Sequence, residues 1–338
     1  MEIKLHHCGN FFLIILAEIN KSEFLMSELP VSRRTLLKGL GAAGAVSFLP
    51  EINYAAPIRK PQFEYCLNMS TIRGHNLGFI KELETAAKAG FRSVEIWIDT
   101  LQTYLKTGGT LKDAKKLIDD LEITVQNAIG FAEWITDDNA ARNKGLEQMK
   151  REMDMLAQIG CKRTAAPPVG ATQLPQLDLK KVAERYRTIL ETGEQTGVMP
   201  HLELWGFSKN LGSVSEVMYV ALESNHPSAK ILLDVFHLYK GNSGLNTLHL
   251  VSPSAVEILH VNDYPANVSP EKITDADRIY PGDGVAPVRQ ILKTLTSPGK
   301  PLIISLEVFN KTYYSQDALQ VAQTGLEKMK AITRDIEL

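Results

Sequence analysis

Short apolar runs alternate with longer helical patterns along most of the chain. The first apolar run covers residues 63–68, and a helical pattern over 79–89 follows it and stops at Gly90. Further strands are expected at 93–98, 123–128, 162–166, 200–206, 231–234, 256–263 and 302–307. Runs of this kind, with little polar alternation, are typical of parallel strands that are buried on both faces of a sheet.

The helical patterns complete a repeating unit of one strand and one helix. They are expected at 79–89, 111–121, 139–159, 178–196, 214–223, 245–250, 285–295 and 315–332. Eight such units are the number that a closed barrel requires, so we predict a single-domain α/β protein with a (β/α)8 TIM barrel at 60–338. A doubly wound open sheet is the alternative, but the glycine-rich first turn that often marks it is absent.

The last four strands each end on a side chain that can bind metal. These side chains are Glu203, Asp234, His260 and Glu307. Because the carboxyl ends of barrel strands ring one pocket, we expect the four to share a common centre. Taken singly, such residues are usually rim residues or helix caps, but their order on consecutive strands favours one divalent ion. Hard oxygen ligands with one imidazole suit manganese, magnesium, cobalt or zinc.

A divalent ion in this place suits chemistry on a sugar. It would polarise a carbonyl and stabilise the enediolate that forms when a base removes the neighbouring proton. Glu203 and Glu307 are both candidates for that catalytic base. His237 follows Asp234 by three residues and is expected to face a substrate hydroxyl. Trp205 is expected to stack on the sugar, whereas Trp97, Trp134 and Phe309 could line the pocket or pack in the core.

The connection at 264–284 is longer than most loops and contains three prolines and a Gly-Asp-Gly sequence. It is a candidate lid or binding loop, and a passive surface insertion is an equal alternative.

Composition narrows the classes of partner. The formal net charge is −2 over 338 residues, which lacks the basic excess of a nucleic-acid binder. Cys8, Cys66 and Cys161 are widely spaced, so a disulfide framework is not expected, although the last two could pair in an oxidising compartment. The expected partner is a small-molecule sugar or keto-sugar, and the sequence leaves a homo-oligomer open.

The residues before the barrel resemble a twin-arginine export signal. Arg33 and Arg34 precede a mildly apolar stretch at 39–50, and the sequence Asn-Tyr-Ala-Ala at 53–56 is a poor match to the small-residue cleavage site. We therefore expect a signal segment at 26–56, a periplasmic protein and no stable membrane insertion after export. A basic amphipathic helix is the alternative. Because Met26 lies just ahead of this segment, residues 1–25 are interpreted as an upstream extension.

From about residue 63 to 332 the chain resembles the xylose isomerase-like TIM-barrel superfamily, in particular its sugar phosphate isomerase/epimerase group. The resemblance implies that Glu203, Asp234, His260 and Glu307 are the metal ligands, that the two glutamates form the acid/base pair, and that His237 binds substrate. The chain departs from the epimerases because Ala266 stands where they carry an arginine, and Arg278, the nearest arginine downstream, is expected to bind substrate. Asp263 could orient His260 or bind substrate, and a solvated loop acid is an equal alternative.

These residues favour a metal-dependent isomerase or epimerase that acts on a non-phosphorylated sugar, because export makes a phosphorylated cytoplasmic substrate a poor match. A lyase or dehydratase that eliminates from a keto-sugar or 3-keto-glycoside is the close alternative, since the same enediolate can expel a leaving group. A non-catalytic periplasmic sugar-binding protein ranks behind both. So does a phosphodiesterase similar to endonuclease IV, which needs more histidines than the strand ends supply.

Overall fold

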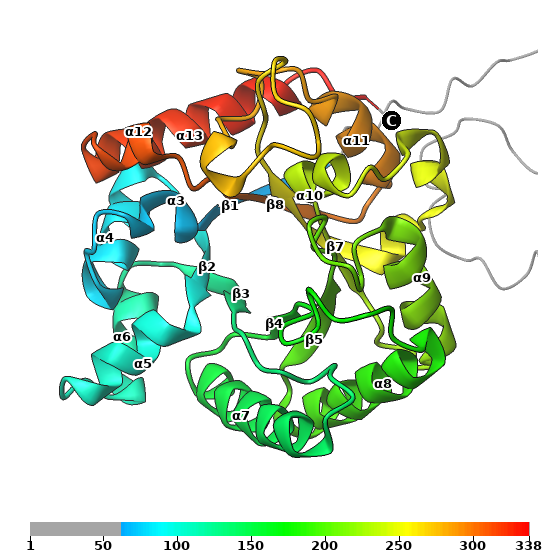
Figure 1. Ribbon diagram of the computed structural model, residues 1–338. Helices are drawn as coiled ribbons and strands as arrows, with labels where there is room; N and C mark the ends of the chain where they lie inside the picture. Colours follow the sequence, from blue (N-terminus) through cyan, green and yellow to red (C-terminus); the bar gives the residue numbers. More distant parts are fainter. Residues whose placement is uncertain (1–61, 338) are drawn as a thin grey trace, which may run out of the picture. The chain divides into compact units, whose positions relative to one another are not determined.

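The computed structural model describes residues 62–337, which form a ring of strands surrounded by helices (Figure 1). The expected upstream extension at 1–25, the signal segment at 26–56 and Cys8 lie outside the described residues. Within 62–337, no helix combines the length and apolar character that a membrane crossing requires.

The eight strands within residues 62–337 are parallel and belong to one sheet. The strands are β1 (Phe63–Asn68), β2 (Ser93–Trp97), β3 (Thr124–Ile129), β4 (Arg163–Ala166), β5 (Met199–Glu203), β6 (Ile231–Asp234), β7 (Val256–Val261) and β8 (Leu302–Leu306). Their order is β3-β2-β1-β8-β7-β6-β5-β4, with β8 paired to β1. The barrel is therefore nearly closed, and β3 and β4 are joined by a hydrogen bond from Thr164 Oγ1 to the Ala128 carbonyl, 3.2 Å. The predicted (β/α)8 barrel is confirmed.

Helices cover the outside of the ring (Figure 1). They are α3 (Ser70–Arg73), α4 (Phe79–Ala89), α5 (Ile98–Lys106), α6 (Leu111–Asp120), α7 (Asn139–Gln158), α8 (Leu179–Thr196), α9 (Val214–Glu223), α10 (Val235–Lys240), α11 (Val288–Leu295), α12 (Lys311–Tyr314) and α13 (Ala318–Thr333), with 3-10 turns η2 (Leu245–Leu250), η3 (Pro253–Ala255) and η4 (Asp275–Asp277). Local chemistry sets several ends. Ser213 and Glu216 form a capping box at the start of α9, and Gly90 ends α4 with a φ of 99°.

The sequence pattern hid several short helices. α5 begins directly after β2, so the apolar Ile98 that the pattern assigned to the strand is the first residue of a helix. The long pattern predicted at 315–332 begins at Ala318 because the Asp317 side chain accepts a hydrogen bond from the Gln320 backbone N–H. α10 directly follows β6 in the same way as α5 follows β2. These short helices matter because they lie at the carboxyl ends of the strands.

The apolar core has two parts. The main part lies between the strands and the surrounding helices. A second cluster takes one buried residue from each of six strands: Cys66, Ile129, Ala165, Leu232, Ile258 and Ile303. Cys66 and Cys161 are both buried free thiols, so the pairing considered for them is absent from the structure. Burial raises the pKa of the Cys161 thiol to about 12, which makes it inert as a nucleophile.

A buried carboxyl group on α4 predicts a pH effect on stability. Glu82 is 5% exposed, and burial raises the pKa of its carboxyl to about 7, with Arg73 opposing and Asp99 adding to the rise. The neutral form is favoured in the folded chain, so stability is full below the unfolded pKa of 4.5 and is lost as pH rises through 7. At pH 8 we expect Glu82→Gln to stabilise the protein by about 1–3 kcal/mol.

Thermal unfolding at pH 5 and pH 8 measures this difference. The gain should be large at pH 8 and small at pH 5. Glu84→Gln, on the same helix at a less buried position, is the matched control and should give no pH-dependent gain. An equal effect of Glu82→Gln at both pH values would contradict the assignment.

Candidate active site

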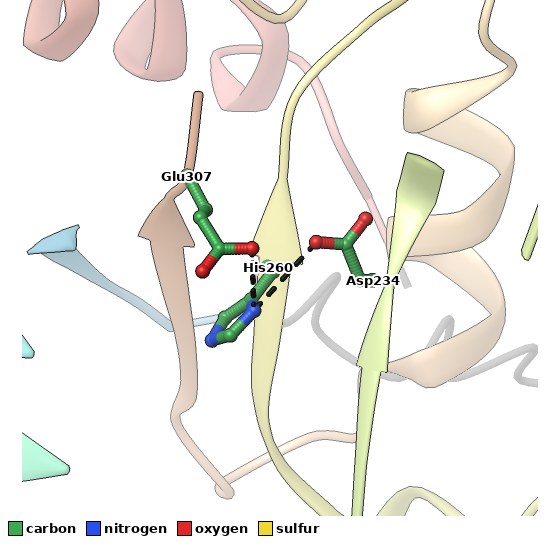
Figure 2. A group of neighbouring side chains, drawn as sticks. All are labelled: Asp234, His260 and Glu307. Atoms are coloured by element: carbon green, nitrogen blue, oxygen red, sulfur yellow. Dashed lines mark ion pairs between the residues drawn. The ribbon is translucent and has the colours of Figure 1, made fainter. Parts of the chain in front are cut away.

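Three side chains with metal-binding atoms meet at the carboxyl ends of neighbouring strands. Asp234 ends β6, His260 lies near the end of β7, and Glu307 directly follows β8. His260 Nδ1 lies 3.1 Å from Glu307 Oε2 and 3.6 Å from Asp234 Oδ2. Figure 2 shows the two carboxylates approaching the imidazole from the strands on either side of β7. One ligand atom from each residue lies within 4.8 Å of the others, and all three residues are buried.

Asp234 is both the last residue of β6 and the N-cap residue of α10. Its Oδ1 atom accepts hydrogen bonds from the backbone N–H groups of Phe236, 2.6 Å, and His237, 3.1 Å, at the start of α10. Oδ2 faces His260 Nδ1 at 3.6 Å and also accepts from Arg278 Nη1 at 2.7 Å. Burial by itself would raise the pKa of Asp234, but the Arg278 guanidinium and the His260 imidazole hold it well below its usual value. The carboxylate is therefore ionised and fixed in direction.

Glu95, in the middle of β2, orients the ring of His260. Glu95 Oε2 lies 2.9 Å from His260 Nε2, on the side of the ring opposite the other two carboxylates. The Glu95 carboxylate is itself held by Asn127 Nδ2 at 2.7 Å, Asn68 Nδ2 at 3.2 Å and the Ser305 hydroxyl. A carboxylate behind a histidine is the usual support for a metal ligand, because it fixes which ring nitrogen faces the ion.

The sequence analysis did not identify the residues of β1, β2 and β3 that support the cluster. Asn68 ends β1, Glu95 lies in the middle of β2, and Asn127 is the fourth of the six residues of β3. The rule that selected polar residues at the ends of the last four strands would have selected Asn68, but Glu95 lies too far inside its strand to be found in this way. Asn68 supports Glu307 as well as Glu95, because its Nδ2 atom also donates to Glu307 Oε1 at 3.0 Å.

We expect Glu95→Gln to weaken binding of a divalent ion by about 10–100-fold, because the neutral amide no longer fixes and polarises His260. Competition with a fluorescent chelator measures this affinity. Glu257→Gln is the control, because it makes the same chemical change on β7 at the strand end away from His260. Glu257 pairs with Arg163 there, so this variant should leave the affinity unchanged. Equal affinities for wild-type protein and Glu95→Gln would show that Glu95 does not support the site.

Glu203 ends β5 and is buried, but it lies outside the group of three. Burial raises the pKa of its carboxyl to about 8, with the negative charges of Glu307 and Asp234 adding to the rise and His260 opposing it. Its Oε2 atom has no hydrogen-bond partner among residues 62–337. Glu203 lies at the end of its strand, as the sequence predicted, and its role as a fourth ligand stays a prediction.

Arg278 reaches the cluster from the long loop after β7. Its Nη1 atom donates to Asp234 Oδ2 and Glu307 Oε2, at 2.7 Å each, and Nη2 donates to Asp275 Oδ1 at 2.5 Å. Nη2 also lies 3.3 Å from His237 Nε2. Burial lowers the pKa of His237 to about 4, so this ring is neutral near pH 7. The loop at 264–284 thus carries a side chain into the site and is more than a passive surface insertion.

Asp263 holds the base of this loop. Its Oδ1 atom accepts from the backbone N–H groups of Tyr264 at 2.8 Å and Ala286 at 2.7 Å, and Oδ2 accepts from Gly282 at 2.9 Å. Both ring nitrogens of His260 face other carboxylates. The expectation that Asp263 orients His260 is therefore wrong, because its carboxylate turns towards the loop. Its expected contact with substrate stays a prediction.

Aromatic rings form an arc at the same end of the barrel. Ring centroids lie 5.4 Å apart for Trp97 and Phe131, 6.3 Å for Phe131 and Trp205, and 5.2 Å for Trp205 and Phe207. Phe131 and Phe207 are each 40% exposed, so the arc offers apolar faces to a ligand, and neither ring was singled out from the sequence.

Two further aromatic residues from the sequence analysis separate clearly. Phe309 joins the arc, with its centroid 6.2 Å from that of Trp97. Trp134 is fully buried, and its indole N–H donates to the Pro167 carbonyl at 2.9 Å. It therefore belongs to the core and not to a substrate pocket.

The donor set fits a divalent cation. His260 Nδ1 lies between two carboxylates without a well-aligned hydrogen bond, although it is buried. Buried polar atoms normally have partners, and two carboxylate oxygens with an imidazole nitrogen are typical ligands of zinc or manganese. His260 has a raised pKa because the neighbouring Glu307 and Glu95 outweigh the effect of burial, so ion binding would release a proton from this ring.

Comparison with known proteins gives the family model and the relatives that the chain resembles. A family model described as xylose isomerase-like TIM barrel matches residues 83–332. The chain is 26% identical to the inosose isomerase of Halalkalibacterium halodurans over 269 residues, 77% of this chain and 93% of the relative. It is 22% identical to the 3-dehydroshikimate dehydratase of Pseudomonas putida over 74% of this chain and 39% of the relative. A solved structure of the IolI protein with a zinc atom superimposes with a TM-score of 0.73 at 22% identity, over 80% of this chain and 98% of that one.

Proposed function

The chain belongs to the xylose isomerase-like TIM barrel family, and we propose that it is a divalent-metal-dependent sugar isomerase or epimerase. The proposed reaction removes the proton next to a carbonyl of a non-phosphorylated sugar or keto-sugar. Manganese, magnesium, cobalt and zinc are the candidate ions. The inosose isomerase relatives support the reaction class, since they cover most of this chain.

One observation carries the proposal. Asp234, His260 and Glu307 converge on a single point at the carboxyl end of the barrel, where TIM-barrel enzymes have their active sites. The convergence is not a product of general packing, because Glu95 and Asn68 hold the imidazole and the carboxylate in direction. In this arrangement Asp234, His260 and Glu307 hold the ion, with Glu203 as the proposed fourth ligand.

A bound divalent ion supplies Lewis-acid polarisation of the substrate carbonyl. Glu307 and Glu203 are proposed to move the proton: one carboxylate takes it from carbon and the other returns a proton to the enediolate. Their surroundings suit this role, because burial raises the pKa of both carboxyl groups towards the working pH of an enzyme. His237, neutral and next to Arg278, is proposed to bind a substrate hydroxyl. Trp205 is proposed to stack on the sugar face.

The proposed substrate carries no phosphate, because the export proposed for this chain makes a phosphorylated cytoplasmic sugar a poor match. We also propose export to the periplasm, on the twin-arginine pattern at 26–56 alone. A neutral sugar suits that compartment.

A carbon–oxygen lyase is the second candidate. The dehydratase relative supports it, because the same proton abstraction precedes elimination. An elimination needs an acid that protonates the leaving group. Glu203 could fill that role, since a pKa of about 8 leaves it mostly protonated at pH 7.

Proton NMR in deuterated water separates the candidates. Purified protein loaded with Mn²⁺ or Zn²⁺ is incubated with free ketoses, with an inosose and with a 3-keto-glycoside. Deuterium at the carbon next to the carbonyl, together with an isomeric product, supports the isomerase or epimerase, and a released alcohol or water with an unsaturated product supports the lyase. Sugar binding without deuterium incorporation in any of the substrates, with the ion bound, would contradict both and indicate a binding protein.

A further inference from the structure

The oxygens that face His260 also bind an arginine. Arg278 Nη1 lies 2.7 Å from Asp234 Oδ2 and 2.7 Å from Glu307 Oε2. These are the two atoms that approach His260 Nδ1 at 3.6 Å and 3.1 Å. The guanidinium and the three expected ligand atoms therefore share one small volume. An arginine contact in this place calls for a reason, because it engages the oxygens that a metal site needs.

The guanidinium is firmly held there. Arg278 is 1% exposed, and its charged group lies over the ring of Phe236 at 4.2 Å and over that of Phe309 at 5.1 Å. Asp275, three residues before it, fixes the other end of the guanidinium, and Asn310 Nδ2 donates to the Arg278 carbonyl at 3.1 Å. Since arginine stays protonated in proteins, this is a permanent positive charge.

A divalent ion and this guanidinium would interfere with each other. Ions of this class bind carboxylate oxygens at about 2.0–2.2 Å, nearer to the oxygen pair than Nη1 lies. Two positive charges at such separation in a buried site repel strongly, because little solvent screens them. The carboxylates also become weaker ligands when they already accept charged hydrogen bonds.

We propose that Arg278 competes with the divalent ion for Asp234 Oδ2 and Glu307 Oε2, and that loading of the ion releases the guanidinium together with the segment that carries it. In the metal-free protein Arg278 keeps the two carboxylates together. After loading, the released guanidinium becomes a free donor at the edge of the pocket, where a substrate oxygen can accept from it. Arg278 is thus a positioning residue that orders the steps: ion first, sugar second. This inference rests on the metal dependence proposed above.

Metal affinity of two variants tests the competition. Arg278→Met removes the charge but retains an apolar chain for the Phe236 and Phe309 rings, and Arg278→Lys keeps the charge. In chelator competition with Mn²⁺ and Zn²⁺, we expect Arg278→Met to bind at least about tenfold more tightly than wild type and Arg278→Lys to stay close to it. Arg163→Met, at the other end of the barrel, is the control and should leave the affinity unchanged. Equal or weaker binding by Arg278→Met would overturn the proposal.

Thermal unfolding of the metal-free proteins tests the other half of the proposal, in which Arg278 stabilises the protein when no ion is bound. Arg278→Met should melt at a lower temperature than wild type without the ion, and the ion should raise its melting temperature by more than that of wild type. If Arg278→Met fails to fold, Asp275→Asn weakens the same contact from the exposed side of the loop and should raise metal affinity by a smaller factor. No gain in affinity in Asp275→Asn would then count against the proposal.

Hydrogen exchange of the wild-type protein follows the released segment. Exchange at residues 274–278 should rise when the ion is added, while the amides of Tyr264, Gly282 and Ala286 stay protected because they donate to the Asp263 carboxylate. Unchanged or slower exchange at 274–278 would overturn the release. If neither wild type nor any variant binds a divalent ion, the proposed metal-dependent function fails as well; binding by wild type without the gain in Arg278→Met removes this inference alone.

Discussion

Replacement of Glu307 with glutamine should reduce proton exchange at the carbon next to the substrate carbonyl by about 10²–10⁴-fold, because an amide cannot accept the proton. The variant keeps the shape of the side chain, and its one remaining oxygen can accept from either Asn68 or Arg278, which donate to different oxygens of Glu307. Deuterium incorporation measured by NMR reports the loss directly. Some bound ion should remain, because Asp234 and His260 still supply ligands.

Glu203→Gln gives the comparison that separates the two carboxylates. If both variants lose exchange, the two glutamates act as a pair. Loss in Glu203→Gln with full exchange in Glu307→Gln would assign the base to Glu203 and contradict the expected result for Glu307. Glu271→Gln, in the loop after β7, should behave like wild type and controls for a general effect of removing a carboxylate.

The second large effect is the loss of metal from His260→Ala. This change removes the ligand between the two carboxylates and leaves Glu95 buried without its imidazole partner. We expect metal occupancy to fall by at least about 100-fold and stability to fall by about 1–3 kcal/mol. Elemental analysis of the purified protein after metal loading measures the occupancy.

His249→Ala is the matched control, because His249 lies on the exposed 3-10 turn η2. It should keep the full metal content. Wild-type occupancy in His260→Ala, with the fold intact by circular dichroism, would show that the ion does not bind at the cluster. His260→Asn would then distinguish loss of a ligand from loss of packing.

Much of the barrel could be predicted from the sequence because its strands are short apolar runs separated by helices of regular period. The bounds of β1, β6, α4 and α9 agree residue by residue. The prediction was least successful where two elements adjoin without a turn. At β2 and α5 the apolar run continues across the boundary, so no polar residue or glycine marks the change from strand to helix.

Part of the candidate site could be predicted from the sequence, and part could not. The ends of β5 to β8 were readable, because a polar residue after a buried strand is conspicuous, and three of the four residues form the cluster. The contacts of Arg278 were beyond the sequence, although the residue had been noted. They depend on the fold of the loop after β7, which is set by the backbone contacts of Asp263 and by stacking on Phe236. No periodic pattern encodes contacts of this kind.

Anomalous diffraction from a manganese-loaded crystal, recorded at the manganese absorption edge, is the most direct measurement. The account predicts one strong peak at bonding distance, about 2.0–2.6 Å, from Asp234 Oδ2, His260 Nδ1 and Glu307 Oε2. A loaded crystal with no peak at this point, or with its peak at another cluster, would contradict the central claim.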